Sequence, residues 1–101
     1  MALDANSAVG PTVVSGTYTG TTAAQTVTLG FQPSWFMCWN VTDGDDFNVW
    51  HKSMTTTFIN IAAAAATVSA VVSTTDHGIT LPASDNDINE NGKVYAFIAG
   101  R

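Results

Sequence analysis

Charge is what this sequence has least of. Charged residues make up 11% of its 101 residues, and Lys52, Lys93 and Arg101 are its only basic ones, which leaves a net charge of −5. An average soluble domain carries about 25% charged residues. Without a basic stripe to neutralise phosphates, we expect no direct binding to nucleic acid and no adsorption to an anionic membrane surface. A surface so poor in charge favours burial against partner subunits, so we expect a homo-oligomer.

Cysteine and long apolar segments are scarce as well. Cys38, the single cysteine, cannot form an intramolecular disulfide, and we expect it to be a small buried side chain. A membrane-spanning helix needs about 18 or more consecutive apolar residues, and no such run is present. The first residues lack the basic start and apolar core of a signal peptide, which predicts synthesis in a cytoplasm without export.

The residue patterns of catalysis are also missing. His51 lies in an expected strand and His77 in an expected turn, and neither has a serine or cysteine nucleophile at a recognisable spacing. There is no G-x-S-x-G turn, and no Gly-rich loop precedes a helix to hold a phosphate. We therefore predict no catalytic residue, no cofactor and no enzymatic activity.

Two acidic turns share some features with metal sites. Residues 85–92 begin like a calcium loop, with carboxylate or amide side chains at alternate positions. However, Glu90 stands where such a loop needs glycine, and Ala96 stands where it needs its closing glutamate. Residues 43–46 form a shorter acidic turn. We favour solvated turns over metal sites at both places; the alternative is a cation shared between subunits.

The sequence is instead rich in short β-strand patterns. Residues 24–30 alternate Val27 and Leu29 with threonines, and a short polar connection joins them to residues 12–20, which predicts a β-hairpin. Residues 34–41 are apolar on both faces, as in the centre of a packed sheet. The other expected strands are 47–52, 58–61, 67–74, 78–81 and 93–100, with a long polar turn at 82–92.

Alternation also assigns side chains to faces. In residues 47–52, Phe47, Val49 and His51 share one face, and Asn48, Trp50 and Lys52 share the other. In the last strand, Val94, Ala96 and Ile98 lie opposite Tyr95 and Phe97. A sugar-stacking platform is the alternative interpretation of the aromatic residues, but we favour core positions for Trp35, Phe36, Trp39, Tyr95 and Phe97. Trp50 is the exception, since we expect one face of its strand to lie at a subunit interface.

A run of five alanines, residues 62–66, interrupts this pattern. Alanine has the highest helix propensity, which favours a helix. The run lacks a charged face and an apolar stripe at helical spacing, and threonines and valines flank it on both sides. We interpret it as a compact connection between strands, with room for one helical turn.

Together these patterns predict an all-β fold. We expect a single antiparallel β-sandwich or small barrel of about seven to eight short strands over residues 14–101. Residues 1–13 form an extended N-terminal arm in this prediction. The residues expected to contact neighbouring subunits are Leu3, Val9 and Val13 of the arm, together with Trp50 and Lys52.

Several segments, in this order, resemble a β-rich module of tailed-bacteriophage virion proteins. "GTYTGTTAAQTVTLGFQPSW" resembles its first hairpin, and "FNVWHKSM" followed by "FINI" resembles its aromatic-His-Lys strand and the short strand after it. The alanine run is similar to its small-residue stretch, and "DHGITLPASDNDINENGKVYAFIAG" resembles its closing pair of strands. The resemblance covers residues 16–100 and implies a component of a phage particle.

The module occurs both in capsid decoration proteins and in tail or fibre proteins. A chain with one compact module and no shaft favours a capsid decoration (cement) protein, which would bind the major capsid protein on the virion surface as a trimer and stabilise the shell across capsomer boundaries. The alternative is a tail-fibre or receptor-binding module whose exposed aromatic residues bind a glycan.

Overall fold

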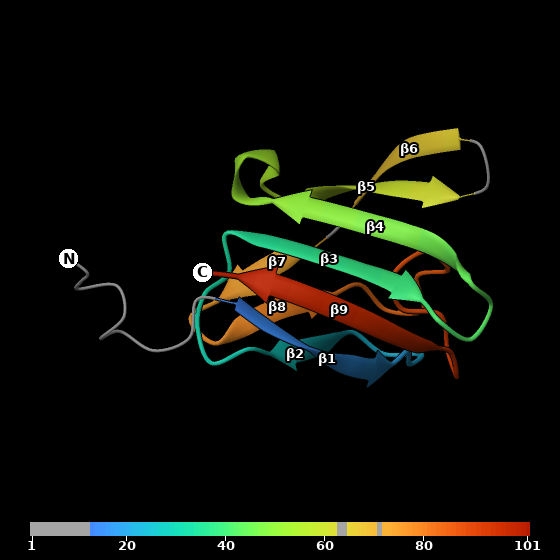
Figure 1. Ribbon diagram of the computed structural model, residues 1–101, viewed down its shortest axis with the longest axis horizontal. Coiled ribbons are helices and arrows are strands. Elements are labelled where there is room, and N and C mark those ends of the chain that lie inside the picture. Colours follow the sequence, from blue (N-terminus) through green and yellow to red (C-terminus); the bar gives the residue numbers. More distant parts are fainter. Residues whose placement is uncertain (1–12, 63–64, 71) are drawn as a thin grey trace.

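The computed structural model describes residues 13–62, 65–70 and 72–101, and these residues form nine β-strands and one short 3-10 helix (Figure 1). The 3-10 helix is η2 (Lys52–Met54). The strands are β1 (Val13–Thr19), β2 (Gln25–Thr28), β3 (Trp35–Asn40), β4 (Asp45–His51), β5 (Thr57–Ala62), β6 (Ala65–Ala70), β7 (Ser73–Thr75), β8 (Gly78–Leu81) and β9 (Val94–Gly100).

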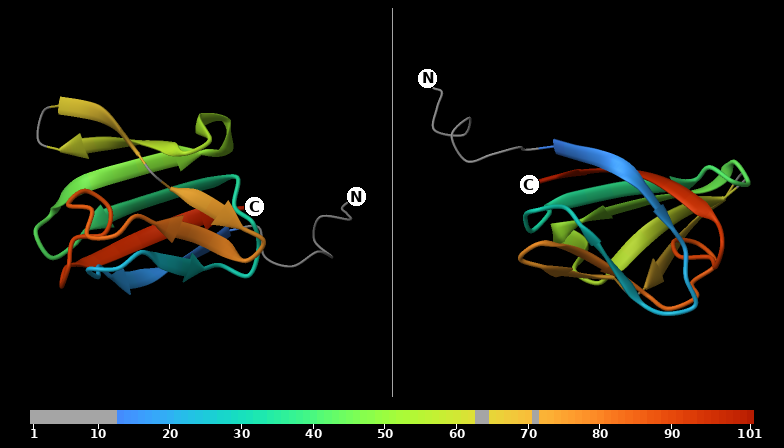
Figure 2. Two further views of the ribbon diagram at one scale, coloured as in Figure 1. Left: turned by 180° about the vertical axis from the view of Figure 1, so that it is seen from behind. Right: turned by 90° about the horizontal axis from the view of Figure 1, so that it is seen from below.

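The strands build two antiparallel sheets of unequal size that pack face to face (Figure 2). The large sheet has six strands in the order β1-β9-β3-β4-β5-β6, and the small sheet has three in the order β2-β8-β7. The all-β class and the sandwich-like arrangement predicted from the sequence are therefore confirmed, although the described residues contain nine strands rather than seven or eight. Of the expected arm, only Val13 lies within the described residues, and it begins β1.

The predicted hairpin of residues 12–20 and 24–30 is wrong. Both segments are strands, but β1 pairs with β9 and β2 pairs with β8, so they belong to different sheets. The chain passes from one sheet to the other after Gly20, which is buried beside the polar turn that precedes β9. Alternation identified the strands and their inward faces, but a strand's partner depends on the other segments competing for its edges.

The alanine run is also not a separate connection. Ala62 ends β5 and Ala65 begins β6, and the two strands pair as a hairpin in which Ile59 lies opposite Val68. Residues 63–64 lie outside the described residues. The strand expected at 67–74 is divided, because β6 belongs to the large sheet and β7 to the small one. The strands expected at 58–61, 78–81 and 93–100 are confirmed within a residue at each end.

The core lies between the sheets and is closed at one side by the long polar turn 82–93. Tyr18 of β1 stacks on Tyr95 of β9 with ring centroids 5.0 Å apart, and its hydroxyl donates a 2.7 Å hydrogen bond to the carbonyl of Ile88 in that turn. The predicted side-chain faces of β4 and β9 are confirmed. The buried core consists of Val27, Leu29, Phe31, Phe36, Cys38, Trp50, Phe58, Val72, Ile79, Leu81, Ile88, Tyr95, Phe97 and Ala99.

The three strands of the small sheet cannot cover the whole inner face of the six-stranded sheet. The polar turn 82–93 covers part of the remainder, and asparagine side chains attach it to the large sheet. Asn48 of β4 donates hydrogen bonds of 2.9 Å to the carbonyls of Asp87 and Asp46. Asn60 of β5 donates a 2.8 Å bond to the side-chain oxygen of Asn48. Because both asparagines are almost fully buried, each unmade bond would leave a desolvated polar group, so these bonds fix the turn against the sheet.

The crossing at Gly20 yields a stability prediction. A methyl group on this residue would overlap the backbone carbonyl of Glu90. We expect Gly20→Ala to lower the free energy of unfolding by about 3 kcal/mol. To admit the methyl group, the backbone must move either at the end of β1 or in the polar turn at Glu90. Urea unfolding followed by tryptophan fluorescence measures this loss.

Gly100→Ala is the matched control. Its methyl group would overlap the indole of Trp35, a half-buried side chain that can rotate away, and we expect a loss of about 1 kcal/mol. Equal losses in the two variants would contradict the assignment of Gly20 as an obligatory close approach of two backbone segments.

Candidate interaction face on the six-stranded sheet

The outer face of the large sheet carries an uninterrupted apolar row across five strands. In register order the row is Ile98 of β9, Met37 of β3, Val49 of β4, Ile59 of β5 and Val68 of β6. Neighbouring members are directly opposite each other in the antiparallel pairing, so their side chains touch across the strands. We call this set the central row.

A second apolar row lies beside it, nearer the turn between β3 and β4. Ala96 of β9 pairs with Trp39 of β3, and Phe47 of β4 pairs with Ile61 of β5, which in turn faces Ala66 of β6. A register shift between Cys38 and Asn40 interrupts the β3–β4 pairing here, and the rings of Trp39 and Phe47 meet instead, with centroids 6.0 Å apart. The five apolar residues Ala96, Trp39, Phe47, Ile61 and Ala66 form the aromatic row.

Much of this face is open to solvent in the single chain. Val68 is 71% exposed, Ile61 42% and Trp39 36%, while Met37 and Val49 are half-buried by their neighbours. A sheet face that is meant for water normally alternates to polar side chains, as the outer face of β2 does with Thr26 and Thr28. A contiguous apolar face of this kind is typical of a surface that binds another macromolecule.

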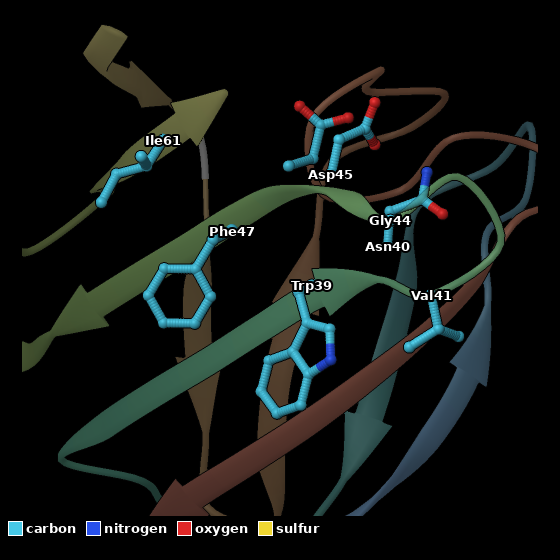
Figure 3. A pocket seen from close by; sticks show the side chains of 8 residues that line it. Trp39, Asn40, Val41, Gly44, Asp45, Phe47 and Ile61 are labelled. Atoms are coloured by element: carbon cyan, nitrogen blue, oxygen red, sulfur yellow. The ribbon is translucent and has the colours of Figure 1, made fainter. Parts of the chain in front are cut away.

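An open hollow of about 710 Å³ lies at the end of the aromatic row, beside the turn that joins β3 to β4 (Figure 3). Its apolar side consists of Trp39, Phe47 and Ile61, and its acidic lining residues are Asp45 and Asp46. The hollow therefore combines an aromatic surface with negative charge, a combination that suits an ammonium or guanidinium group or the face of a sugar ring.

One carboxylate of the hollow is held in an unfavourable environment. Asp46 has a backbone φ of 54°, and its Oδ1 accepts a 3.3 Å hydrogen bond from Asn60. Burial raises the pKa of its carboxyl above the ordinary value of 3.8; the bond from Asn60 opposes this, and the charges of Asp45 and Asp87 add to it. The hollow thus concentrates negative charge that a cation would neutralise.

The predicted contact residues are only partly on the surface of the molecule. Val13 is 52% exposed on the edge strand β1, and Lys52 is exposed in η2. The structure does not support the predicted subunit contact of Trp50. Its side chain is buried in the core, and its indole N–H donates a 2.9 Å hydrogen bond to the carbonyl of Thr55. Leu3 and Val9 lie outside the described residues.

The aromatic residues divide between the core and this face. Phe36, Tyr95 and Phe97 are buried in the core as expected, and Trp50 is buried with them, whereas Trp39 lies on the outer face. Trp35 is half-buried there beside Gly100. The central row was not among the predicted contact residues, although the apolar residues on both faces of residues 34–41 were its signal in the sequence. That pattern predicts a strand covered on both sides, and within the described residues β3 is covered on one.

The residues considered for calcium binding have structural roles. Asn89 is fully buried, and its amide group donates to the carbonyls of Ala23 and Pro82. Its Oδ1 accepts bonds from the N–H of Thr21 and the side chain of Gln25. These four bonds use the side chain completely. Within the described ranges, no group of three His, Cys, Asp or Glu side chains is placed to hold a metal ion.

The contact between a histidine and a serine is a local cap. Nδ1 of His51 accepts a 3.1 Å bond from the N–H of Ser53 and lies 2.8 Å from its hydroxyl, at the start of η2. A nucleophilic serine needs a base that removes its proton and a third group that orients this base. Here the imidazole of His51 instead caps η2, because its Nδ1 accepts the backbone N–H of Ser53. The geometry explains the pair without catalysis.

Searches of protein-family models, curated proteins and solved structures found no significant match to this chain. Among the residues described here, no helix is long and apolar enough to cross a membrane. The role of this chain is therefore inferred from the geometry of the outer face of the large sheet.

Cys38 lies directly beneath this face and should be chemically inert. Burial raises the pKa of its thiol to about 12, which leaves almost no thiolate at neutral pH. We expect the folded protein not to react with an aromatic disulfide reagent at neutral pH, and to react promptly in guanidinium chloride. Thiol titration by absorbance measures both rates.

Thr28→Cys is the control, because it places a second thiol on the exposed face of β2. This variant should release one equivalent of reagent chromophore rapidly while Cys38 stays silent. Rapid reaction of the original folded chain would contradict the burial of Cys38.

Asp46 predicts a pH dependence. Since its pKa is raised in the folded state, the folded protein binds this proton more tightly than the unfolded chain does. The resulting stabilisation is complete below the unfolded pKa, about 3.8, and is lost as the pH rises through the higher folded value. Asp46→Asn removes this effect, so the variant should gain stability relative to the original chain as pH rises through that window.

Urea unfolding midpoints of both proteins, measured from pH about 3.5 to pH about 7, test this expectation. Asp76→Asn, in the exposed turn between β7 and β8, controls for the loss of one negative charge. A difference between Asp46→Asn and the original chain that stays constant across the window would contradict the prediction.

Proposed function

We propose that this protein is a non-enzymatic structural component of a bacteriophage particle, namely a decoration protein that binds the outer capsid surface. The observation that carries the proposal is the central row, with Met37, Val49 and Ile59 at its middle, on a sheet face that has no covering layer within the described chain. Burial of this face against protein is the stabilising contact that such a component needs.

The chemistry of the described residues agrees with this proposal. The thiol of Cys38 is buried, and His51 serves as a cap. What remains distinctive is a two-sheet sandwich with a large apolar surface, which suits a mechanical role. The resemblance of residues 16–100 to the phage virion module is the reason for proposing a phage particle. The proposed partner on that particle is the major capsid protein.

The mechanism is an addition of contacts across boundaries in the shell. Packaged DNA pushes the capsomers apart, and a rigid protein bound across their junctions adds apolar contacts that must break before they separate. A β-sandwich suits this load because its strands are cross-linked by ladders of backbone hydrogen bonds. Contacts from Leu3 and Val9 of the arm remain a prediction.

The hollow favours one second candidate, a glycan-binding module of a tail or fibre. Trp39 and Phe47 offer an aromatic surface beside the carboxylates of Asp45 and Asp46, which can accept hydrogen bonds from sugar hydroxyls. A glycan array tests this with Trp39→Ala, since Trp50 and Tyr95 are buried and would act through stability alone.

The decoration role is tested on particles of the phage that encodes this chain, prepared with the gene intact and deleted. We expect the protein on the outer capsid by cryo-electron microscopy, and we expect the deleted particles to lose their DNA at lower temperature or under milder osmotic shock. Complementation with Ile59→Lys should fail to restore resistance, because a charge then interrupts the central row.

Thr28→Lys is the matched complementation control, since it adds the same charge on the exposed face of the small sheet. It should restore resistance fully. Particles that contain no copy of the protein on the capsid, or that resist heat and shock equally without it, would contradict the proposal.

A further inference from the structure

A second, smaller hollow lies where the ends of the two sheets meet. Its volume is about 380 Å³, and it is formed by the loop before β3, the end of β4, the 3-10 helix η2 with its C-cap residue, and β7 of the small sheet. Figure 1 shows η2 and the C-terminus at one end of the strands and the β3–β4 turn, with its acidic hollow, at the other. The polar lining residues are Gln32, Ser34, Lys52, Thr55 and Thr74.

Hydrogen bonds hold the walls of this hollow together. The backbone N–H of Lys52 donates a 2.8 Å bond to the carbonyl of Ser34, which joins η2 to the loop before β3. The side-chain Nε2 of Gln32 donates a 3.2 Å bond to the hydroxyl of Thr74, which joins the same loop to the small sheet. The walls come from three separate segments and are already connected, so a ligand would meet a preformed site.

Thr55 occupies a backbone conformation that its side chain disfavours. Its φ is 61° and its ψ is −94°, a region that glycine enters freely and that a β-branched residue rarely adopts. The carbonyl of Thr55 accepts a 2.9 Å bond from the buried indole N–H of Trp50, and its N–H donates to the carbonyl of Lys52. Residues strained in this way gather at ligand-binding sites, and Thr55 lines the hollow.

The lining offers one positive charge surrounded by groups that bind hydroxyls. Lys52 supplies an ammonium group, and in the described part of the chain no carboxylate lines the hollow or pairs with this lysine. Within the same ranges the hydroxyls of Ser34 and Thr55 have no hydrogen-bond partner. Gln32 retains its side-chain oxygen as an acceptor. A ligand that suits these groups carries a carboxylate and several hydroxyls.

We propose that this hollow binds one acidic sugar residue of a glycan, with the sugar carboxylate on the ammonium group of Lys52. Ring hydroxyls then bond to the side chains of Ser34 and Thr55, while the buried residues Pro33 and Trp50 form an apolar floor. A hollow of about 380 Å³ is at the small end of ligand sites, which limits the occupant to about one sugar ring. Lys52 and Thr55 are exposed at the rim, so the adjoining sugars extend into solvent.

This site is separate from both surfaces used in the proposed function. Among the described residues, none of those that line it belongs to the central row or to the aromatic row. The acidic hollow beside Trp39 has the opposite charge, and its carboxylates would repel an acidic sugar. The proposal therefore goes beyond the capsid contact, and either one can fail without the other.

Titration of the ¹⁵N-labelled full chain with methyl β-glucuronide tests the proposal. The methyl group replaces the preceding sugar, so the probe represents a residue within a glycan. We expect the indole N–H signal of Trp50 to shift with a dissociation constant on the order of 1 mM, and that of Trp39 to stay in place. Methyl β-glucoside, which lacks only the carboxylate, and acetate, which lacks the ring, should each bind at least about tenfold more weakly.

Variants assign the two central roles. Lys52→Met should weaken glucuronide binding about tenfold and abolish the preference over glucoside, whereas Lys93→Met, which removes the same charge at the other end of the strands, should change neither. Thr55→Gly should weaken binding roughly fivefold while raising the urea midpoint, because glycine accepts the φ of 61°. A purely structural Thr55 would change stability and leave binding intact. Circular dichroism verifies that each variant is folded.

The results that would overturn the proposal are distinct. A Trp50 signal that does not move up to about 50 mM glucuronide means that no site of useful strength exists. Acetate binding as tightly as glucuronide would make the hollow a simple anion site, and equal binding of glucoside would remove the role of the carboxylate. A shift of Trp39 in place of Trp50 would move sugar binding to the acidic hollow.

Discussion

The inequality of the two sheets is the constraint on which the other features of this molecule depend. Six strands present a larger inner surface than three strands can cover. The core therefore needs a further covering element beneath β4 and β5, and the polar turn before β9 supplies it. Because that turn carries polar side chains, its attachment uses buried asparagines, each of which must be fully hydrogen-bonded to remain buried at acceptable cost.

This solution also explains why acidic side chains gather near the turn between β3 and β4. Bringing the polar turn against β4 places Asp87 close to Asp46, and both carboxylates come to share one region with Asp45. Packing thus holds Asp46 where burial and the neighbouring carboxylates raise its pKa. A surface that presents such a carboxylate beside exposed aromatic side chains is stabilised by any partner that brings a cation to it.

Sequence alone predicted the class of the fold because strand formation is largely local. The alternation of Tyr95 and Phe97 with Val94 and Ile98 fixes which side chains face inward, whatever strand lies alongside. Pairing is not local: residues 12–20 and 24–30 are close in sequence, yet each has a better partner in the C-terminal half, and a buried crossing at Gly20 separates them. The asparagine contacts could not be foreseen, since they join β4 to residues 39 positions away.

The interaction face shows a different limit of sequence reasoning. Residues 34–41 are apolar on both faces, a pattern that predicts burial on both sides but cannot say whether the chain itself supplies the second layer. Within the described residues, the fold supplies one layer only. Apolar contact is also non-directional, so a flat row such as Met37, Val49 and Ile59 could meet a partner in many orientations.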